Sequence, residues 1–231
     1  MKRGPDSREE YMNTTKVAAF FDFDQTLVEV ETGRMAMQWM RDNRMILPGY
    51  MLKVLTANIM YKLGLFSEER MVRVMLTFYR GRKLEDFRKG SEKFYREYLQ
   101  PHLAPAILSR VALHKERGHL LVLISASLRY LLEPVMDDLG FDVLLCTDLE
   151  EKDGILTGKP VWPVCIKDHK KSVTLKIARE YGLNLEESYA YGDSHSDLPL
   201  LELVGHPHAV EPSPLLEKIA RRRAWPVLSY R

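Results

Sequence analysis

The stretch Val17–Glu29, VAAFFDFDQTLVE, brings two aspartates into an otherwise apolar run. The run is short and rich in aromatic and small apolar residues, which predicts a buried first strand that ends near Asp24. In open α/β sheets the carboxyl ends of parallel strands form the edge where ligands bind. Alternation along the strand puts the side chains of Asp22 and Asp24 on one face, with Thr26 near them. Two carboxylates so near each other repel, so we expect a cation or a shared proton between them. The alternative is that both aspartates cap the following turn.

Later segments indicate the fold class. Residues 118–127 (GHLLVLISAS) and 188–194 (SYAYGDS) are typical of buried strands, and 172–183 (SVTLKIAREYGL) is typical of an amphipathic helix that ends at Gly182. Strands that alternate with helices predict a doubly wound parallel sheet of the α/β class, covered on both faces. Residues 32–102 show helical spacing and hardly any strand signal, so we expect an all-helical insertion after the first strand.

The composition limits the classes of partner. The chain has 231 residues, 45% of them hydrophobic, which suffices for one sizeable core with an appended smaller domain. Its formal net charge of +2 gives no case for a nucleic-acid partner. Cys146 and Cys165 fit no metal-ligand spacing and indicate free thiols in a reducing compartment. The polar opening segment has no apolar stretch of a secretory signal, so we expect a cytoplasmic protein without a membrane partner.

More polar residues follow the other predicted strands. Asp193 and Asp197 lie in YGDSHSD after the 188–194 strand, and four carboxylates at strand ends favour a hard cation such as magnesium. Ser125 ends LLVLIS and can donate a hydrogen bond to a phosphate oxygen. Lys170 and Lys171 precede the helix expected from Ser172 and could neutralise an anion. Carboxylates, a hydroxyl and an ammonium on one rim indicate phosphoryl chemistry.

This ordered set of motifs resembles the haloacid dehalogenase superfamily of phosphohydrolases. The first motif, DxDx[TV], matches DFDQT; the second, a strand-end serine or threonine, matches LISAS; the third, a lysine, matches HKKS; and the fourth, GDxxxD, matches GDSHSD. The segments ISAS, DGILTG and YGDSHSDLPLLELVGHPHAV are similar to the IB hydrolases of the phosphoserine phosphatase branch. The resemblance covers nearly the whole chain from about Val17, and the joint pattern is far more specific than any single motif.

The resemblance implies a division of the chain. Residues 1–16 would form a flexible N-terminal tail, because they are polar and lack an apolar pattern. Residues 17–31 and 103–231 would form the Rossmann-like α/β core of the family. Residues 32–102 would form its helical C1 cap.

The resemblance also implies the catalytic roles. Asp22 would attack phosphorus and become an aspartyl phosphate, while Asp24 would protonate the leaving oxygen and later deprotonate water. Ser125 and a lysine would hold phosphate oxygens. Lys171 is chosen over Lys170 because a leucine follows Lys171 four residues on, in KSVTL, as it usually does in this family.

Magnesium is the implied cofactor. Its implied ligands are Asp22, the backbone carbonyl of Asp24, and Asp193, with Asp197 in support. The implied reaction is therefore the magnesium-dependent hydrolysis of a small phosphomonoester.

Substrate choice depends on a few residues near the motifs. Glu31 falls where phosphoserine phosphatases receive the substrate ammonium, which favours an amine-bearing phosphate. Thr26 and Ala126 are further candidate substrate contacts. Those enzymes follow the second motif's serine with two glycines, whereas Ala126 and Ser127 follow Ser125 here. A side chain then occupies the space in which the backbone of the glycines approaches the substrate, which argues against phosphoserine itself.

Two alternatives stay open. A phosphotransferase that passes the phosphoryl group to an acceptor other than water would share every motif. A non-catalytic binding module of the same fold would have no need of both Asp22 and Asp24. The partner expected is a small-molecule phosphomonoester, and the oligomeric state expected is a monomer or a homodimer.

Overall fold

The structure is a computed structural model, and it describes residues 16–231. The predicted N-terminal tail, residues 1–16, lies outside the described residues except for Lys16. No helix among the described residues has both the length and the apolar character needed to cross a membrane.

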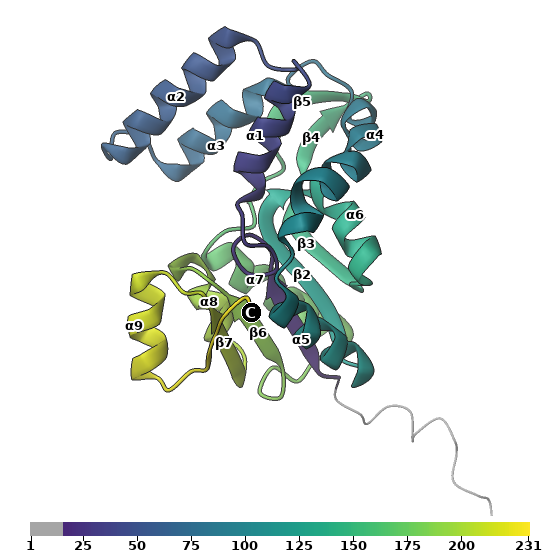
Figure 1. The fold of residues 1–231 in the computed structure, drawn as a ribbon, viewed down its shortest axis with the longest axis vertical. Coiled ribbons are helices and arrows are strands. Elements are labelled where there is room, and N and C mark those ends of the chain that lie inside the picture. The colour runs from purple at the N-terminus through teal and green to yellow at the C-terminus, as the bar shows by residue number, and fades with distance from the viewer. Residues whose placement is uncertain (1–15) are drawn as a thin grey trace, which may run out of the picture.

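Six parallel strands form the central sheet, in the order β3-β2-β1-β6-β7-β8 (Figure 1). The strands are β1 (Ala18–Asp22), β2 (Leu120–Leu128), β3 (Val143–Thr147), β6 (Tyr189–Gly192), β7 (His206–Val210) and β8 (Val227–Leu228). The predicted doubly wound α/β class is confirmed. The chain builds outward from β1 in one direction to β3 and in the other to β8, so the strand order reverses between β1 and β6. A crevice at such a reversal is where open sheets bind ligands, and β1 delivers Asp22 to it.

Strand β1 is apolar on both faces because helices cover both sides of the sheet. All five of its residues are buried, and Phe20 and Phe21 point into different clusters of the core. Phe21 stacks on Tyr191 of β6, with 4.4 Å between ring centroids. The covering helices are α5 (Pro105–Glu116), α6 (Arg129–Leu139), α7 (Asp168–Tyr181), α8 (Leu198–Leu201) and α9 (Pro214–Arg222). Burial on both faces fixes β1 as a rigid base for the side chains at its end.

The segment between β1 and β2, here called the insertion (residues 32–102), contains helices and no strand among its described residues. It comprises α1 (Thr32–Asp42), α2 (Pro48–Lys62), α3 (Glu68–Leu76), α4 (Leu84–Phe94) and the short helical turns Thr77–Tyr79, Tyr95–Leu99 and Gln100–His102. Figure 1 shows α1, α2 and α3 beyond the carboxyl ends of the strands, whereas α4 lies alongside α6. There Phe87 contacts Tyr130, with 5.6 Å between ring centroids. The insertion therefore shares apolar core with the sheet domain.

The chain after β3 forms a two-stranded antiparallel hairpin that the sequence did not predict, β4 (Leu149–Lys152) and β5 (Ile155–Pro160). Its turn is formed by Asp153 and Gly154, both with positive φ, as the tight hairpin turns with an Asp-Gly pair require. The hairpin is bonded to the insertion: Gly81 N donates to Leu156 O at 2.9 Å, and Leu156 N donates to Arg82 O at 2.8 Å. The hairpin thus connects the insertion to the chain that follows β3.

Candidate active site

The loop after β1 turns back sharply and presents the two motif aspartates. Asp22 is the last residue of β1 and is buried. Phe23 O then accepts hydrogen bonds from both Leu27 N and Val28 N, at 2.9 and 3.1 Å, which closes a tight loop. Asp24 Oδ1 accepts from the backbone N–H of Thr32, the first residue of α1. The start of the insertion is therefore tied to the carboxylate of Asp24.

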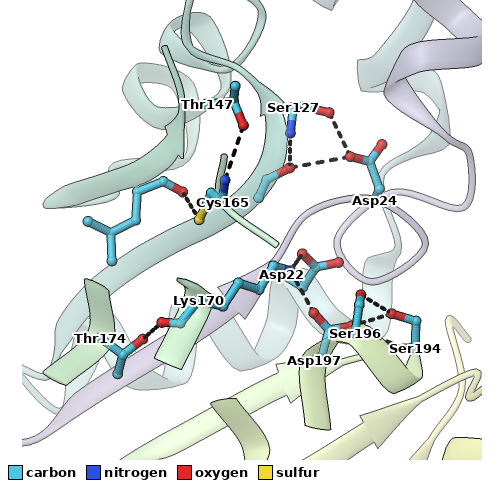
Figure 2. A network of polar contacts seen from close by, with 12 residues as sticks. Asp22, Asp24, Ser127, Thr147, Cys165, Lys170, Thr174, Ser194, Ser196 and Asp197 are labelled. Atoms are coloured by element: carbon cyan, nitrogen blue, oxygen red, sulfur yellow. Dashed lines mark hydrogen bonds and ion pairs between the residues drawn. The ribbon is translucent and has the colours of Figure 1, made fainter. Parts of the chain in front are cut away.

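Asp22 meets a buried lysine and a second aspartate, as Figure 2 shows. The ammonium of Lys170 lies 2.5 Å from Asp22 Oδ1 and 2.6 Å from Asp197 Oδ1. Asp197 is fully buried, and its other oxygen accepts from the N–H and the hydroxyl of Ser194, at 3.1 and 2.8 Å. Every oxygen of Asp197 is thus occupied, which fixes its orientation.

The expectation that Lys171 points into this cluster is wrong. Lys170 is 3% exposed and contacts the carboxylates, whereas Lys171 is exposed to solvent. Helix α7 begins at Asp168, four residues before the predicted start at Ser172, so both lysines lie within it. Lys170 shares its buried face with Thr174, one turn on, whose hydroxyl donates to Lys170 O at 2.8 Å. The leucine four residues after Lys171, on which the choice of Lys171 rested, lies on a neighbouring face of α7 that is less buried.

Without a further cation, the three carboxyl groups of the cluster cannot all be ionised at neutral pH. Burial opposes the charge of Lys170, but Asp197 and Asp22 outweigh it and raise its pKa. Burial and the neighbouring carboxylates raise the pKa of Asp22, although Lys170 opposes this. For Asp193, burial and then Asp197 raise the pKa to about 8. Burial also disfavours the charge on Asp197, yet Lys170 prevails and lowers its pKa. Three carboxylates therefore face one ammonium.

These carboxylates fit a hard divalent ion. One oxygen each from Asp22, Asp193 and Asp197 lie within 4.8 Å of one another. Magnesium prefers a few carboxylate oxygens together with water and phosphate oxygens, and its charge would allow all three carboxyl groups to ionise beside Lys170. Among the four residues predicted as ligands, Asp24 does not bring its side chain to this group. That the backbone carbonyl of Asp24 binds the ion stays a prediction.

The carboxylate of Asp24 points instead toward β2 (Figure 2). Asp24 Oδ2 accepts from the hydroxyl of Ser127 at 2.8 Å and from that of Ser125 at 3.3 Å, and Ser127 N donates to Ser125 Oγ at 3.0 Å. From the sequence, Ser127 is predicted only as an obstacle to substrate. Its spacing of two from Ser125 could have placed both hydroxyls on one face of the strand.

A cavity of about 310 Å³, here called the polar cavity, opens on the cluster. It is lined by the predicted residues Asp22, Asp24, Glu31, Ala126 and Asp193, and also by Gln25, Gly33, Ile166, Lys170, Ser194 and Ser196. The carboxylate of Glu31 accepts from Gln25 Nε2 at 3.0 Å. Two predicted residues, Thr26 and Ser125, are fully buried and are not among the lining residues. The Thr26 hydroxyl has no hydrogen-bond partner among the described residues.

Comparison with known proteins indicates the family to which the chain belongs. A family model described as haloacid dehalogenase-like hydrolase matches residues 19–202. A histidinol-phosphatase of Neisseria meningitidis serogroup C (strain 8013) is 33% identical over 151 residues, which are 64% of this chain and 68% of that protein. Phosphoserine phosphatase SerB1 of Mycobacterium tuberculosis (strain ATCC 25618 / H37Rv) is 30% identical over 219 residues, which are 93% of this chain and 71% of that protein.

Solved structures share the fold. A protein with unknown function from Bordetella pertussis Tohama I superposes with a TM-score of 0.86 at 28% identity, covering 94% of this chain and 100% of that one. A substrate-bound phosphoserine phosphatase superposes with a TM-score of 0.67 at 23% identity, covering 94% of each chain, which shows a common fold. With the ordered motifs and the parallel sheet, these matches establish that the chain belongs to the haloacid dehalogenase-like hydrolases and is an enzyme similar to the phosphoserine phosphatases.

Proposed function

We propose that the chain is a magnesium-dependent phosphatase that hydrolyses a small phosphomonoester through an aspartyl phosphate formed on Asp22. One observation carries the proposal: the carboxylate of Asp22 lies at the strand-order reversal, against a buried ammonium and two further carboxylates. A structural ion pair would need only one carboxylate beside the ammonium, whereas here further carboxyl groups, which are hard to ionise without a cation, lie beside an open cavity. A catalytic site that receives a cation and an anionic substrate accounts for both.

In the first step an oxygen of Asp22 forms a bond to phosphorus as the bond from phosphorus to the alcohol oxygen breaks. Asp24 gives its proton to that oxygen, so that the alcohol leaves neutral. The hydrogen bonds from Ser127 and Thr32 hold Asp24 at the rim of the polar cavity, from which it can reach the leaving group. Lys170, already directed at Asp22, offsets the negative charge on the phosphoryl oxygens.

In the second step water attacks phosphorus and gives its proton to Asp24. The bond between phosphorus and Asp22 breaks, which restores the carboxylate and releases inorganic phosphate. Asp22, Asp193 and Asp197 would hold magnesium, which when bound supplies positive charge next to the phosphoryl oxygens. Ser125, whose hydroxyl donates to Asp24 in this structure, is proposed to turn that donation to a phosphate oxygen.

An amine-bearing alcohol is the proposed leaving group. Glu31 lines the polar cavity with Asp22 and Asp24, and its carboxylate is suited to an ammonium group. The names of two relatives support the same chemistry, because serine and histidinol are both amino alcohols. We further propose that the insertion acts as a cap that shields the site from bulk water, since Gly33 at the start of α1 also lines the cavity.

The test is a screen of phosphomonoesters with magnesium, in which released phosphate and released alcohol are both measured. Equal amounts of the two support hydrolysis, and alcohol in excess of phosphate supports transfer to another acceptor. Chelation should stop the reaction and magnesium restore it, whereas calcium should inhibit because its larger, more flexible oxygen shell spoils in-line attack by Asp22.

Asp22→Asn is the decisive variant. It should abolish turnover while the circular dichroism spectrum stays that of the parent. A folded and active Asp22→Asn protein, or full activity after metal removal verified by elemental analysis, would refute the proposal.

A further inference from the structure

A second cavity, of about 190 Å³, adjoins the polar cavity and is here called the apolar cavity. Its wall is formed by α1, α3 and the ends of β2 and β3, and includes the methionines Met37, Met40 and Met75. Gly33, Ala126 and Ile166 line both cavities. The two cavities therefore meet at these three small or apolar residues, and we expect a substrate whose phosphate lies at Asp22 to extend past them into the apolar cavity.

The hydroxyl groups at the wall of the apolar cavity are already engaged. Tyr50 donates to Met75 O at 2.6 Å, and the hydroxyls of Tyr79 and Tyr130 lie 2.8 Å apart. Ser127 is directed at Asp24, and Thr147 Oγ1 accepts from Cys165 N at 3.3 Å. A charged group placed here would lose its hydration without gaining a partner, whereas hydrocarbon would be favoured by burial.

No arginine or lysine is among the described residues that line the apolar cavity, and Lys170 is the one lysine lining the polar cavity. Lys170 is held by Asp22 and Asp197. The guanidinium of Arg82, on the insertion, stacks on Phe78 at 3.9 Å from the ring centroid and lines neither cavity. The carboxylate of phosphoserine would therefore lack a cation in this site.

We propose that the preferred substrate is the phosphate ester of an amino alcohol that carries a ring-sized, mostly apolar substituent, and that this substituent occupies the apolar cavity. The inference rests on the proposed phosphatase activity. An apolar cavity of about 150 Å³ in another protein holds a benzene molecule, so 190 Å³ suits one ring or a short branched chain. The methionine side chains can adjust to the shape of such a group.

The experiment compares phosphate esters that keep the amine and vary only the substituent. Phosphoethanolamine has none, phosphoserine has a carboxylate, leucinol phosphate has a branched chain, and phenylalaninol and histidinol phosphates have rings. Each buried carbon of the substituent should raise kcat/KM about fourfold, so leucinol phosphate, with four more carbons, should exceed phosphoethanolamine by about 250-fold. Both ring esters should also exceed phosphoethanolamine, and phosphoserine should fall below it.

Filling the apolar cavity should remove this preference. Val72 of α3 lines the cavity, whereas Val74 of the same helix does not, so Val72→Phe and Val74→Phe form a matched pair. Val72→Phe should reduce the ratio of kcat/KM for phenylalaninol phosphate to that for phosphoethanolamine by about tenfold or more. Val74→Phe should leave the ratio unchanged. Gly33→Val, where an added Cβ meets nothing within 4 Å, narrows the junction and should reduce the same ratio.

The outcomes separate the inference from the proposed function. Absence of phosphate release from every ester with magnesium refutes the phosphatase activity itself. Hydrolysis of phosphoethanolamine and glycerol phosphate, with no gain from a ring or branched chain, overturns the inference alone. An unchanged ratio in both Val72→Phe and Gly33→Val, each shown to be folded by circular dichroism, also overturns it.

Discussion

Replacing Lys170 with methionine is the sharpest test of how the site is held together. Methionine keeps most of the length of the side chain and removes its ammonium group. In the parent that group lies 2.5 Å from Asp22 and 2.6 Å from Asp197, and the lysine is 3% exposed. Lys170→Met therefore leaves two buried carboxylates without their shared cation.

The expected loss of stability follows from this burial. Breaking a buried ion pair by removing one partner costs about 3–5 kcal/mol, because the remaining charge is buried and uncompensated. The variant can reduce the cost by protonating Asp22 or Asp197, whose folded-state pKa rises once Lys170 is gone. The unfolded chain ionises these groups near pH 4, so the stability of the variant falls as pH rises above about 4. The full loss is expected at about pH 8 and a smaller one at about pH 5.

The assay is urea unfolding in chelator, followed by circular dichroism at both pH values. Lys171→Met is the matched control: the exposed neighbour should change the free energy of unfolding by less than about 0.5 kcal/mol. In magnesium, Lys170→Met should also lower kcat/KM by about 100- to 1,000-fold, as removal of one charge-stabilising donor does. Equal stability of the parent and Lys170→Met at pH 8, or equal losses in the two lysine variants, would refute this account of the site.

Four further predictions follow from other contacts. Asp24→Asn should slow hydrolysis of an alkyl phosphate by about 100-fold or more and of 4-nitrophenyl phosphate far less, because only the poor leaving group needs a proton; equal losses contradict acid catalysis. Glu31→Gln should lower the ratio of kcat/KM for phosphoethanolamine to that for glycerol phosphate by roughly ten- to a hundredfold, the equivalent of about 1.5 to 3 kcal/mol; an unchanged ratio removes the amine preference. Gly192→Ala should lower stability by about 1–3 kcal/mol and raise the magnesium concentration needed for half-maximal activity, because the added Cβ would lie 2.7 Å from the Cβ of Asp197. Unfolding curves and magnesium titrations identical to those of the parent contradict this. Burial lowers the pKa of His114 to about 4, so the protein should lose about 3 kcal/mol of stability as pH falls from about 6.5 to 4 and the unfolded chain takes up a proton at this histidine. Urea unfolding of His114→Phe should therefore depend less on pH than that of the parent. Equal pH dependence in the two proteins contradicts this.

The strands and the residues at their ends could be predicted from the sequence, whereas features that depend on packing between distant segments could not. Apolar runs that end in carboxylates located β1 and β6, because period-two alternation and burial on both faces constrain such runs strongly. The choice between Lys170 and Lys171 failed because the face of a helix depends on where it begins, and α7 begins at Asp168. The apolar cavity could not be predicted, since its wall combines side chains from elements far apart in the chain.

The β4–β5 hairpin was missed although its Asp153-Gly154 pair is a strong turn signal. The flanking segments do not alternate cleanly between apolar and polar residues, so no pair of strands stood out around the turn. Its partner in space, the segment around Gly81, lies far away in the sequence, and their backbone hydrogen bonds leave no local pattern.

The backbone bonds between this hairpin and the insertion restrict how substrate can enter. If the insertion tilts away from the sheet, Leu156 must travel with Gly81 and Arg82, to which it is bonded on both sides. The chain leaving β5 at Pro160 runs directly to Ile166, at the junction of the two cavities, and then into α7. Tilting therefore pulls on the same stretch that positions the buried ammonium. If the insertion acts as the proposed cap, we expect its opening to displace Lys170 from Asp22, so that entry of substrate and binding of its phosphate are coupled through the hairpin.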